Sequence, residues 1–88
     1  MADVVTLGNG FRLGLGTPRR DGDAVLVKGI LAHEGRAVSP VIYFRWYSDA
    51  NIEMTDDQGE EWAPPRGTDF WSANDYLTAV CSEFLKGV

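Results

Sequence analysis

The chain has only one cysteine, Cys81, and only one histidine, His33, among its 88 residues. A lone cysteine excludes a disulfide bond within the chain and fits a reducing compartment. A zinc site would need carboxylates or water to complete its four ligands. Cys81 lies in an apolar pattern typical of inert packing, and His33 lies beside Glu34 in a predicted loop. We therefore expect no catalytic residue, no metal and no cofactor, and we expect that the protein is not an enzyme.

Long hydrophobic runs are also absent from the sequence. No apolar stretch approaches the roughly 18 residues that a helix needs to span a bilayer. The first residues, Met1-Ala2-Asp3, lack the basic and apolar regions of a signal peptide. We expect a cytoplasmic protein without a membrane partner, folded as one domain over residues 1–88.

The whole chain has a net charge of −5, and basic residues are scarce in its second half. Residues 1–48 hold six basic and four acidic side chains, whereas residues 49–88 hold nine acidic side chains and two basic ones. The segment 49–61 contains no base and six acids, which are Asp49, Glu53, Asp56, Asp57, Glu60 and Glu61. Such a concentration of negative charge repels phosphate backbones and attracts basic surfaces. Direct binding of nucleic acid is therefore disfavoured as the main role.

Residues 41–47 (VIYFRWY) form the stretch richest in aromatic and β-branched side chains, and they predict the central strand of a sheet. Side chains alternate along a strand, which puts Ile42, Phe44 and Trp46 on one face and Val41, Tyr43, Arg45 and Tyr47 on the other. The first face is apolar and must be covered by a core. The second face can be solvated or can meet a partner, and the residues alone leave both possibilities open.

The dipeptide Asn9-Gly10 predicts a two-residue hairpin turn, because both residues tolerate the positive φ angles of a type I′ turn. The flanking strands, residues 4–8 and 11–15, are expected to share a core face made by Val4, Phe11, Leu13 and Leu15. A turn-rich connection over residues 16–23 leads to a third strand, residues 24–32. Within that strand, Gly29 marks a bulge or the close approach of a neighbour.

After a loop over residues 33–40, the strand at 41–47 is expected to pair antiparallel with the preceding one. Residues 52–54 and 60–62 can form a short hairpin, and the Pro64-Pro65 dipeptide then imposes an extended path.

One helix follows, with Ser72 as its predicted N-cap and Gly87 at its end. Its apolar stripe consists of Tyr76, Leu77, Val80, Cys81, Phe84 and Leu85. These elements predict an α+β fold, in which a four- to six-stranded antiparallel meander sheet is packed by one C-terminal helix.

The acidic segment also resembles the spacing of a calcium-binding loop, whose ligand positions 1, 3, 5 and 12 would be Asp49, Asn51, Glu53 and Glu60. Met54 occupies the sixth position, where the loop requires glycine for a sharp turn, and no helix is expected before it. We therefore expect no calcium site.

The charge distribution favours a non-catalytic module that occupies a basic surface of a partner protein. Spaced carboxylates can imitate phosphates and so inhibit a nucleic-acid-binding protein, by analogy with inhibitors that phages use against host defence. The predicted contact residues are Tyr43, Arg45, Tyr47, Asp49, Glu53, Asp56, Asp57, Glu60, Glu61 and Trp62. One alternative is a single-stranded nucleic-acid-binding domain that stacks bases on the aromatic and arginine face of residues 41–47. Another is a small structural subunit that pairs its strand edges with its own copies, for example as a homodimer.

Overall fold

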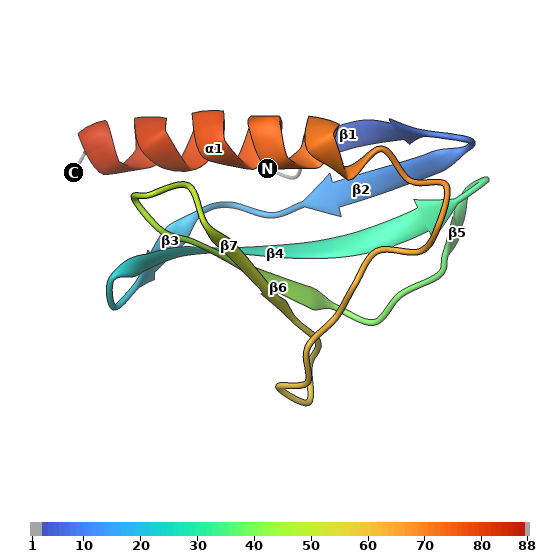
Figure 1. Cartoon of the computed structure of the whole chain (residues 1–88), viewed down its shortest axis with the longest axis horizontal. Helices are drawn as coiled ribbons and strands as arrows, with labels where there is room; N and C mark the ends of the chain where they lie inside the picture. The colour runs from blue at the N-terminus through green and yellow to red at the C-terminus, as the bar shows by residue number, and fades with distance from the viewer. Residues whose placement is uncertain (1–2, 88) are drawn as a thin grey trace.

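The computed structural model describes residues 3–87. Within these residues, a seven-stranded antiparallel sheet packs against one helix, α1 (Phe70–Lys86), at the C-terminal end (Figure 1). The strands are β1 (Asp3–Gly8), β2 (Phe11–Leu15), β3 (Arg19–Asp21), β4 (Ala24–His33), β5 (Arg36–Ala37), β6 (Ile42–Trp46) and β7 (Ile52–Thr55). The predicted α+β fold, a meander sheet packed by a C-terminal helix, is confirmed, and the short strands β3 and β5 add to the predicted strands.

The central strand is β4, in the order β1-β2-β4-β6-β7, so the prediction that residues 41–47 form the centre is wrong. With ten residues, β4 is long enough to pair with β2 and β3 along one side and with β5 and β6 along the other. Gly29 makes this close packing possible. A Cβ at Gly29 would lie 2.7 Å from Phe44 Cε2 and 2.9 Å from Leu15 Cδ2, which confirms the predicted close approach.

The short strands β3 and β5 arise in two segments, residues 16–23 and 33–40, that were expected to lack strands. The chain passes from β3 to β4 through a turn at Gly22, with φ 60°, and from β4 to β5 through Glu34 and Gly35, with φ 51° and 85°. Their own sequences have little preference for strands, so the sequence alone indicates only the turns. Pairing with the long edges of β4 decides that both segments are extended.

The first hairpin forms as predicted around Asn9-Gly10, whose φ angles are 53° and 81°. Its register differs from the prediction because β1 is irregular between Thr6 and Gly8, where one extra residue faces β2. An extra residue moves the side chains on its two sides to different faces of the sheet. Val4, which was predicted to lie in the core, is therefore 63% exposed, whereas Leu7 is fully buried.

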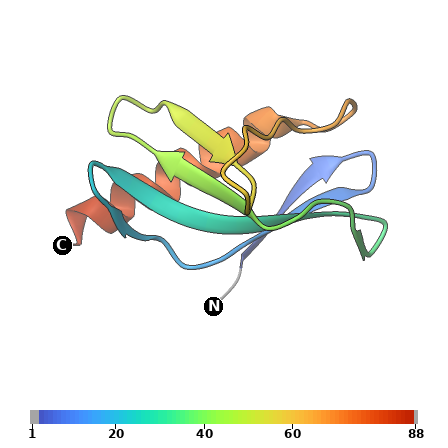
Figure 2. The ribbon, with the colours of Figure 1, turned by 90° about the horizontal axis from the view of Figure 1, so that it is seen from below.

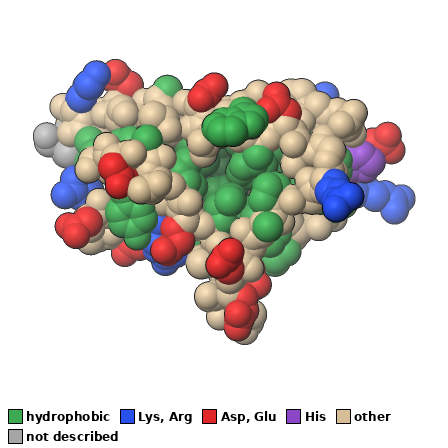
Figure 3. Space-filling model, viewed as in Figure 1, with side chains coloured by type: hydrophobic (Ala, Val, Ile, Leu, Met, Phe, Trp, Pro, Cys, Tyr) green, Lys and Arg blue, Asp and Glu red, His purple; other side chains and the backbone are tan. Residues whose placement is uncertain are grey.

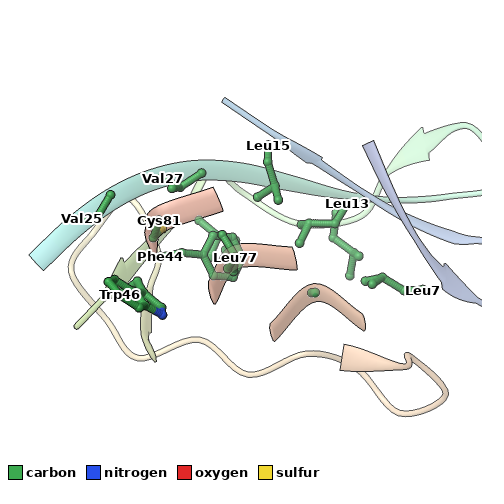
Figure 4. Close-up of a cluster of buried hydrophobic side chains, with 12 residues drawn as sticks. Leu7, Leu13, Leu15, Val25, Val27, Phe44, Trp46, Leu77 and Cys81 are labelled. Carbon is green, nitrogen blue, oxygen red and sulfur yellow. The ribbon is translucent and has the colours of Figure 1, made fainter. Parts of the chain in front are cut away.

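The apolar face of β6 lies where the alternation predicts it, with Ile42, Phe44 and Trp46 buried. These side chains meet those of β1, β2, β4 and α1 in one core (Figure 4). Its buried members are Leu7, Leu13, Leu15, Val25, Val27, Leu31, Ile42, Phe44, Trp46, Ala73, Leu77 and Cys81. The indole Nε1–H of Trp46 donates to Thr78 Oγ1 at 3.2 Å, and this hydrogen bond links β6 to α1.

Helix α1 begins at Phe70 and lies across one face of the sheet (Figure 2). The prediction of Ser72 as the N-cap is wrong, because Ser72 lies in the first turn and its hydroxyl donates to Asp69 Oδ2 at 3.0 Å. The Asp69 N–H donates to Leu7 O at 2.7 Å, and this tertiary bond to β1 places the helix start earlier. The end at Gly87 is as predicted. In the part of the chain that the structure describes, no helix is long and apolar enough to cross a membrane.

Candidate functional site

The acidic segment 49–61 includes β7, which forms one edge of the sheet. After β7 the chain turns back, so that Trp62 N–H donates to Met54 O at 3.0 Å and Thr55 pairs with Glu61 in an isolated bridge. The predicted hairpin of residues 52–54 and 60–62 is therefore present, but its second arm is a single bridge. The two prolines that follow at 64 and 65 have no N–H with which to extend the pairing.

Two of the six carboxylates in this segment stabilise turns. Asp49 Oδ1 accepts the N–H of Asn51 at 3.1 Å, and Asp56 Oδ1 accepts the N–H groups of Gln58 and Glu60 at 2.9 Å each. The other four are exposed and have no hydrogen-bond or ionic partner within residues 3–87, and they are Glu53, Asp57, Glu60 and Glu61. Their charge is available to a partner molecule.

An open hollow of about 1260 Å³ lies beside β7 and reaches Leu85 near the end of α1. Its apolar lining is made by Ile52, Met54, Trp62 and Leu85, and its charged lining is made by Arg20, Asp23, Asp49, Glu53 and Glu61. Figure 3 shows hydrophobic side chains gathered in a hollow between the helix and the tip of the molecule, with acidic side chains around it. An apolar floor with a charged rim is the arrangement found in many protein interfaces.

The flank of α1 beside this hollow carries an exposed aromatic residue. Trp71, Thr78 and Leu85 are spaced seven residues apart, so they follow one stripe along the helix. Thr78 bonds to Trp46 of β6 and Leu85 lines the hollow, which places the stripe on the β6–β7 side. Trp71 is 77% exposed on this flank. Trp71 is not among the predicted contact residues, although the sequence shows that it lies two seven-residue steps before Leu85.

On the opposite face of the sheet, Tyr43 and Arg45 line a second, smaller hollow together with Glu53, Asp56 and Asp57. Arg45 is already engaged, because its Nε lies 2.9 Å from Asp21 Oδ2 and its Nη1 donates to Thr55 Oγ1 at 3.1 Å. The Lys28 ammonium lies 5.8 Å from the centre of the Tyr43 ring. A base that stacked on Tyr43 would have to displace Lys28, and a phosphate would compete with Asp21 for Arg45.

The predicted contact residues therefore divide into two groups on the two sides of β7. Tyr47, Asp49, Glu61 and Trp62 line the larger hollow, and Tyr43, Arg45, Asp56 and Asp57 line the smaller one. Glu53 lines both, and Glu60 lines neither. Arg20 and Asp23 also line the larger hollow and are not among the predicted contact residues, because nothing in the local sequence indicates that the β3–β4 turn lies beside residues 47–53.

His33 and Cys81 occupy separate structural environments. The His33 ring packs on Phe11 with 4.4 Å between ring centres, and its Nε2 lies 3.0 Å from Asn9 O at the first hairpin. Cys81 is buried in the core, and this burial raises the pKa of its thiol to about 11. A thiol with a raised pKa is a poor nucleophile at neutral pH. Within residues 3–87, no three side chains of the metal-binding types are grouped closely enough to hold an ion together.

The position of this chain among known proteins gives no further guidance to the role of the two hollows. No protein-family model, no curated protein and no solved structure matches the chain.

Proposed function

We propose that the protein is a non-catalytic binding module that occupies a basic surface of a partner protein. The observation that carries this proposal is the hollow beside β7, in which apolar residues such as Met54 and Trp62 lie among four acidic side chains and one basic side chain, that of Arg20. Desolvated aromatic and aliphatic anchors supply most of the affinity in protein interfaces, and a charged rim selects partners of opposite sign. This surface provides both parts.

The charge on the rim of this hollow, at Glu53 and Glu61, and on the turn that follows β7, at Asp57 and Glu60, is accessible. Glu53, Asp57, Glu60 and Glu61 are exposed and have no ionic partner among the described residues. Unpaired charges of one sign accelerate the encounter with an oppositely charged protein and make its rate sensitive to salt. A nucleic-acid-binding protein presents such a basic surface, so the module would act as an inhibitor by taking the place of phosphates, in the cytoplasm. This last step rests on analogy with phage inhibitors.

A single-stranded nucleic-acid-binding role is the second candidate. It is favoured by the outer face of the sheet, where Arg12, Arg19 and Lys28 are exposed and Tyr43 is half-buried. The ion pair between Arg45 and Asp21 and the position of Lys28 over Tyr43 weigh against it. Neutralising acids on β7 and its turn affects the two functions in opposite directions, so one set of variants distinguishes them.

The test uses a variant in which Glu53, Asp57, Glu60 and Glu61 are all replaced by the corresponding amides. Asp49 and Asp56 stay unchanged because their carboxylates hold turns. The partner is captured from lysate with the wild-type protein and purified, and association rates are measured at two salt concentrations. We expect the variant to associate roughly ten times more slowly at low salt, with a weaker salt dependence. Glu83→Gln, an exposed change on α1, is the control and should have little effect.

A single-stranded oligonucleotide is measured alongside the captured partner. Binding of the partner that is equally fast in the four-amide variant would contradict the proposed function. Tight binding of the oligonucleotide by the wild type, strengthened in the variant, would favour the nucleic-acid role instead.

A further inference from the structure

The outer face of the sheet carries a shallow apolar groove along β2. In Figure 2 the sheet lies in front of α1, which packs on the inner face. On the outer face, Val4 of β1 lies opposite Gly14 of β2, and Gly14 lies opposite Ile30 of β4. Val4 is 63% exposed and Ile30 is 43% exposed, and Gly14 between them has no side chain. An antiparallel sheet ordinarily presents polar side chains on its solvated face, so an exposed apolar groove indicates a contact surface.

Two cations lie on either side of the row formed by Val4, Gly14 and Ile30. Arg12 lies two residue pairs from this row in one direction, opposite Ala32, and Lys28 lies two pairs from it in the other direction. Four residue pairs along the strands correspond to about 14 Å. Both side chains are exposed, and within residues 3–87 neither has a carboxylate at ion-pair distance. Arg12 and Lys28 are called the basic pair below.

The exposed face of α1 carries a complementary pattern. It presents, at four-residue intervals, Trp71, Asp75, Ala79 and Glu83, all of which are exposed. Asp75 and Glu83, called the acidic pair below, are eight residues apart, which is about 12 Å along a helix. Asp75 has no ionic partner among the described residues, and Glu83 has only a long, exposed contact of 3.7 Å with Lys86. Such an exposed pair contributes little to stability, so both carboxylates are available for a contact.

We infer that the protein associates with a second copy of itself, so that the exposed face of α1 of one copy lies along the β2 groove of the next. The spacing of the acidic pair, about 12 Å, agrees with that of the basic pair, about 14 Å, so both carboxylates can meet a cation at once. Ala79 lies midway between the acids and is small enough to approach Gly14. Trp71, which is 77% exposed, adds apolar area at the N-terminal end of the helix face.

This interface joins two different faces, so it is a head-to-tail contact in which each copy keeps one free face of each kind. Further copies can therefore add until a ring closes. One helix face on one sheet face is a small interface, and we expect a Kd on the order of 100 μM. The inference is independent of the proposed function, because neither the acidic pair nor the basic pair lines either hollow.

Sedimentation equilibrium measures the association. The salt concentration is about 0.15 M, at which the Debye length of about 8 Å screens the repulsion between chains that each carry a net charge of −5. At about 1 mM protein, the weight-average mass of the wild type should be at least about twice the 9.7 kDa of one chain. A wild type that stays monomeric under these conditions would overturn the inference.

Three arginine variants test the two faces. Ala79→Arg places a long basic side chain at the centre of the helix face, and Gly14→Arg fills the groove. A Cβ at Gly14 would meet only Ile30 O, at 3.9 Å, so the sheet has room for this change. Each variant should sediment as a monomer at about 1 mM. Gln58→Arg adds the same side chain to the exposed turn after β7 and is the control, whose Kd for self-association should stay within about twofold of the wild type.

Mixing the two face variants tests the head-to-tail arrangement. The Ala79→Arg protein keeps an intact sheet face, and the Gly14→Arg protein keeps an intact helix face. The mixture therefore has one native interface, whereas the two altered faces both carry an added positive charge and repel each other. It should form a dimer that does not grow, and this dimer would also show that both variants are folded. A mixture that stays monomeric while both variants keep the wild-type Tm would overturn the inference.

The wild type gives a test that needs no variant. Between about 0.05 and 1 mM protein, the nuclear magnetic resonance signals of Arg12, Ile30, Asp75 and Ala79 should shift with concentration, and those of residues 56–59 should change little. Shifts confined to other surfaces would overturn the inference.

The four-amide variant separates this inference from the proposed function. It keeps both the acidic pair and the basic pair, so it should self-associate like the wild type. Loss of self-association in this variant would assign the contact to segment 49–61 and overturn the inference. Its binding to the captured partner decides the proposed function separately, whatever its state of association.

Discussion

Gly29→Ala tests the central packing of the sheet directly. The added Cβ would lie 2.7 Å from Phe44 Cε2, 2.9 Å from Leu15 Cδ2 and 3.2 Å from Gly14 O, so two core side chains or the neighbouring backbone must move. Overpacking of this kind costs about 1–3 kcal/mol. The loss of freedom in the unfolded chain returns about 0.4–1 kcal/mol. We expect a net destabilisation of about 1–2 kcal/mol, or a Tm lower by roughly 5–15 °C.

Gly14→Ala in the adjacent strand is the matched control. Its added Cβ would meet only Ile30 O, at 3.9 Å, and neither glycine has a positive φ angle. Gly14→Ala should therefore be neutral or stabilising by up to about 1 kcal/mol. Both stabilities are measured by urea unfolding.

A double-mutant cycle identifies the clash. Phe44→Leu removes the ring that the new Cβ meets, so Gly29→Ala should cost less in the Phe44→Leu background, with a coupling of at least about 0.5 kcal/mol. Additive effects, or equal stabilities of the Gly29→Ala and Gly14→Ala proteins, would refute the reasoning that β4 is the tightly packed centre.

Three further results are expected. Phe44→Ala should cost about 3–5 kcal/mol in urea unfolding, whereas Tyr43→Ala on the outer face should cost far less, and equal losses would contradict the assignment of faces. Stability should fall as pH rises above 9. Burial raises the pKa of Cys81 from 9.0 to about 11, and the hydrogen bond to Asp3 raises that of Tyr76 from 10.0 to about 12, so both groups favour folding only while protonated. In the Tyr76→Phe and Cys81→Ala variants, the urea concentration at the unfolding midpoint should depend less on pH between pH 9 and 12 than in the wild type. The same pH dependence in variant and wild type would argue against a raised pKa of that residue in the folded protein. His33→Ala should change the Kd for the partner by no more than about twofold, because the His33 ring lies at the first hairpin and not at the larger hollow. A folded His33→Ala protein that does not bind the partner would show that the binding site includes the first hairpin.

Local chemistry determines those parts of the fold that depend on a few neighbouring residues. Asn9-Gly10 specifies a hairpin turn because both residues accept positive φ angles. The alternation in residues 42–46 specifies the buried face of β6, and the helical spacing through Leu77 and Cys81 specifies the face of α1 that is buried. The acidic character of segment 49–61 is likewise a property of composition alone.

Tertiary structure decides the features that depend on which segments meet. β4 became the centre because its length offers two edges to four partners, a comparison that no single segment contains. The bulge before Gly8 buries Leu7 in place of Val4, and the bond from Asp69 to Leu7 starts α1 earlier than its own sequence indicates.

The candidate site shows the same division. Its acids could be read from the sequence, but the hollow forms only where the β3–β4 turn, β7, Trp62 and Leu85 converge. The engagement of Arg45 by Asp21, 24 residues away in the chain, likewise weakens a nucleic-acid platform that the strand pattern alone leaves possible. Periodicity and turn propensity act over a few residues, whereas burial and strand pairing are settled by competition across the whole chain.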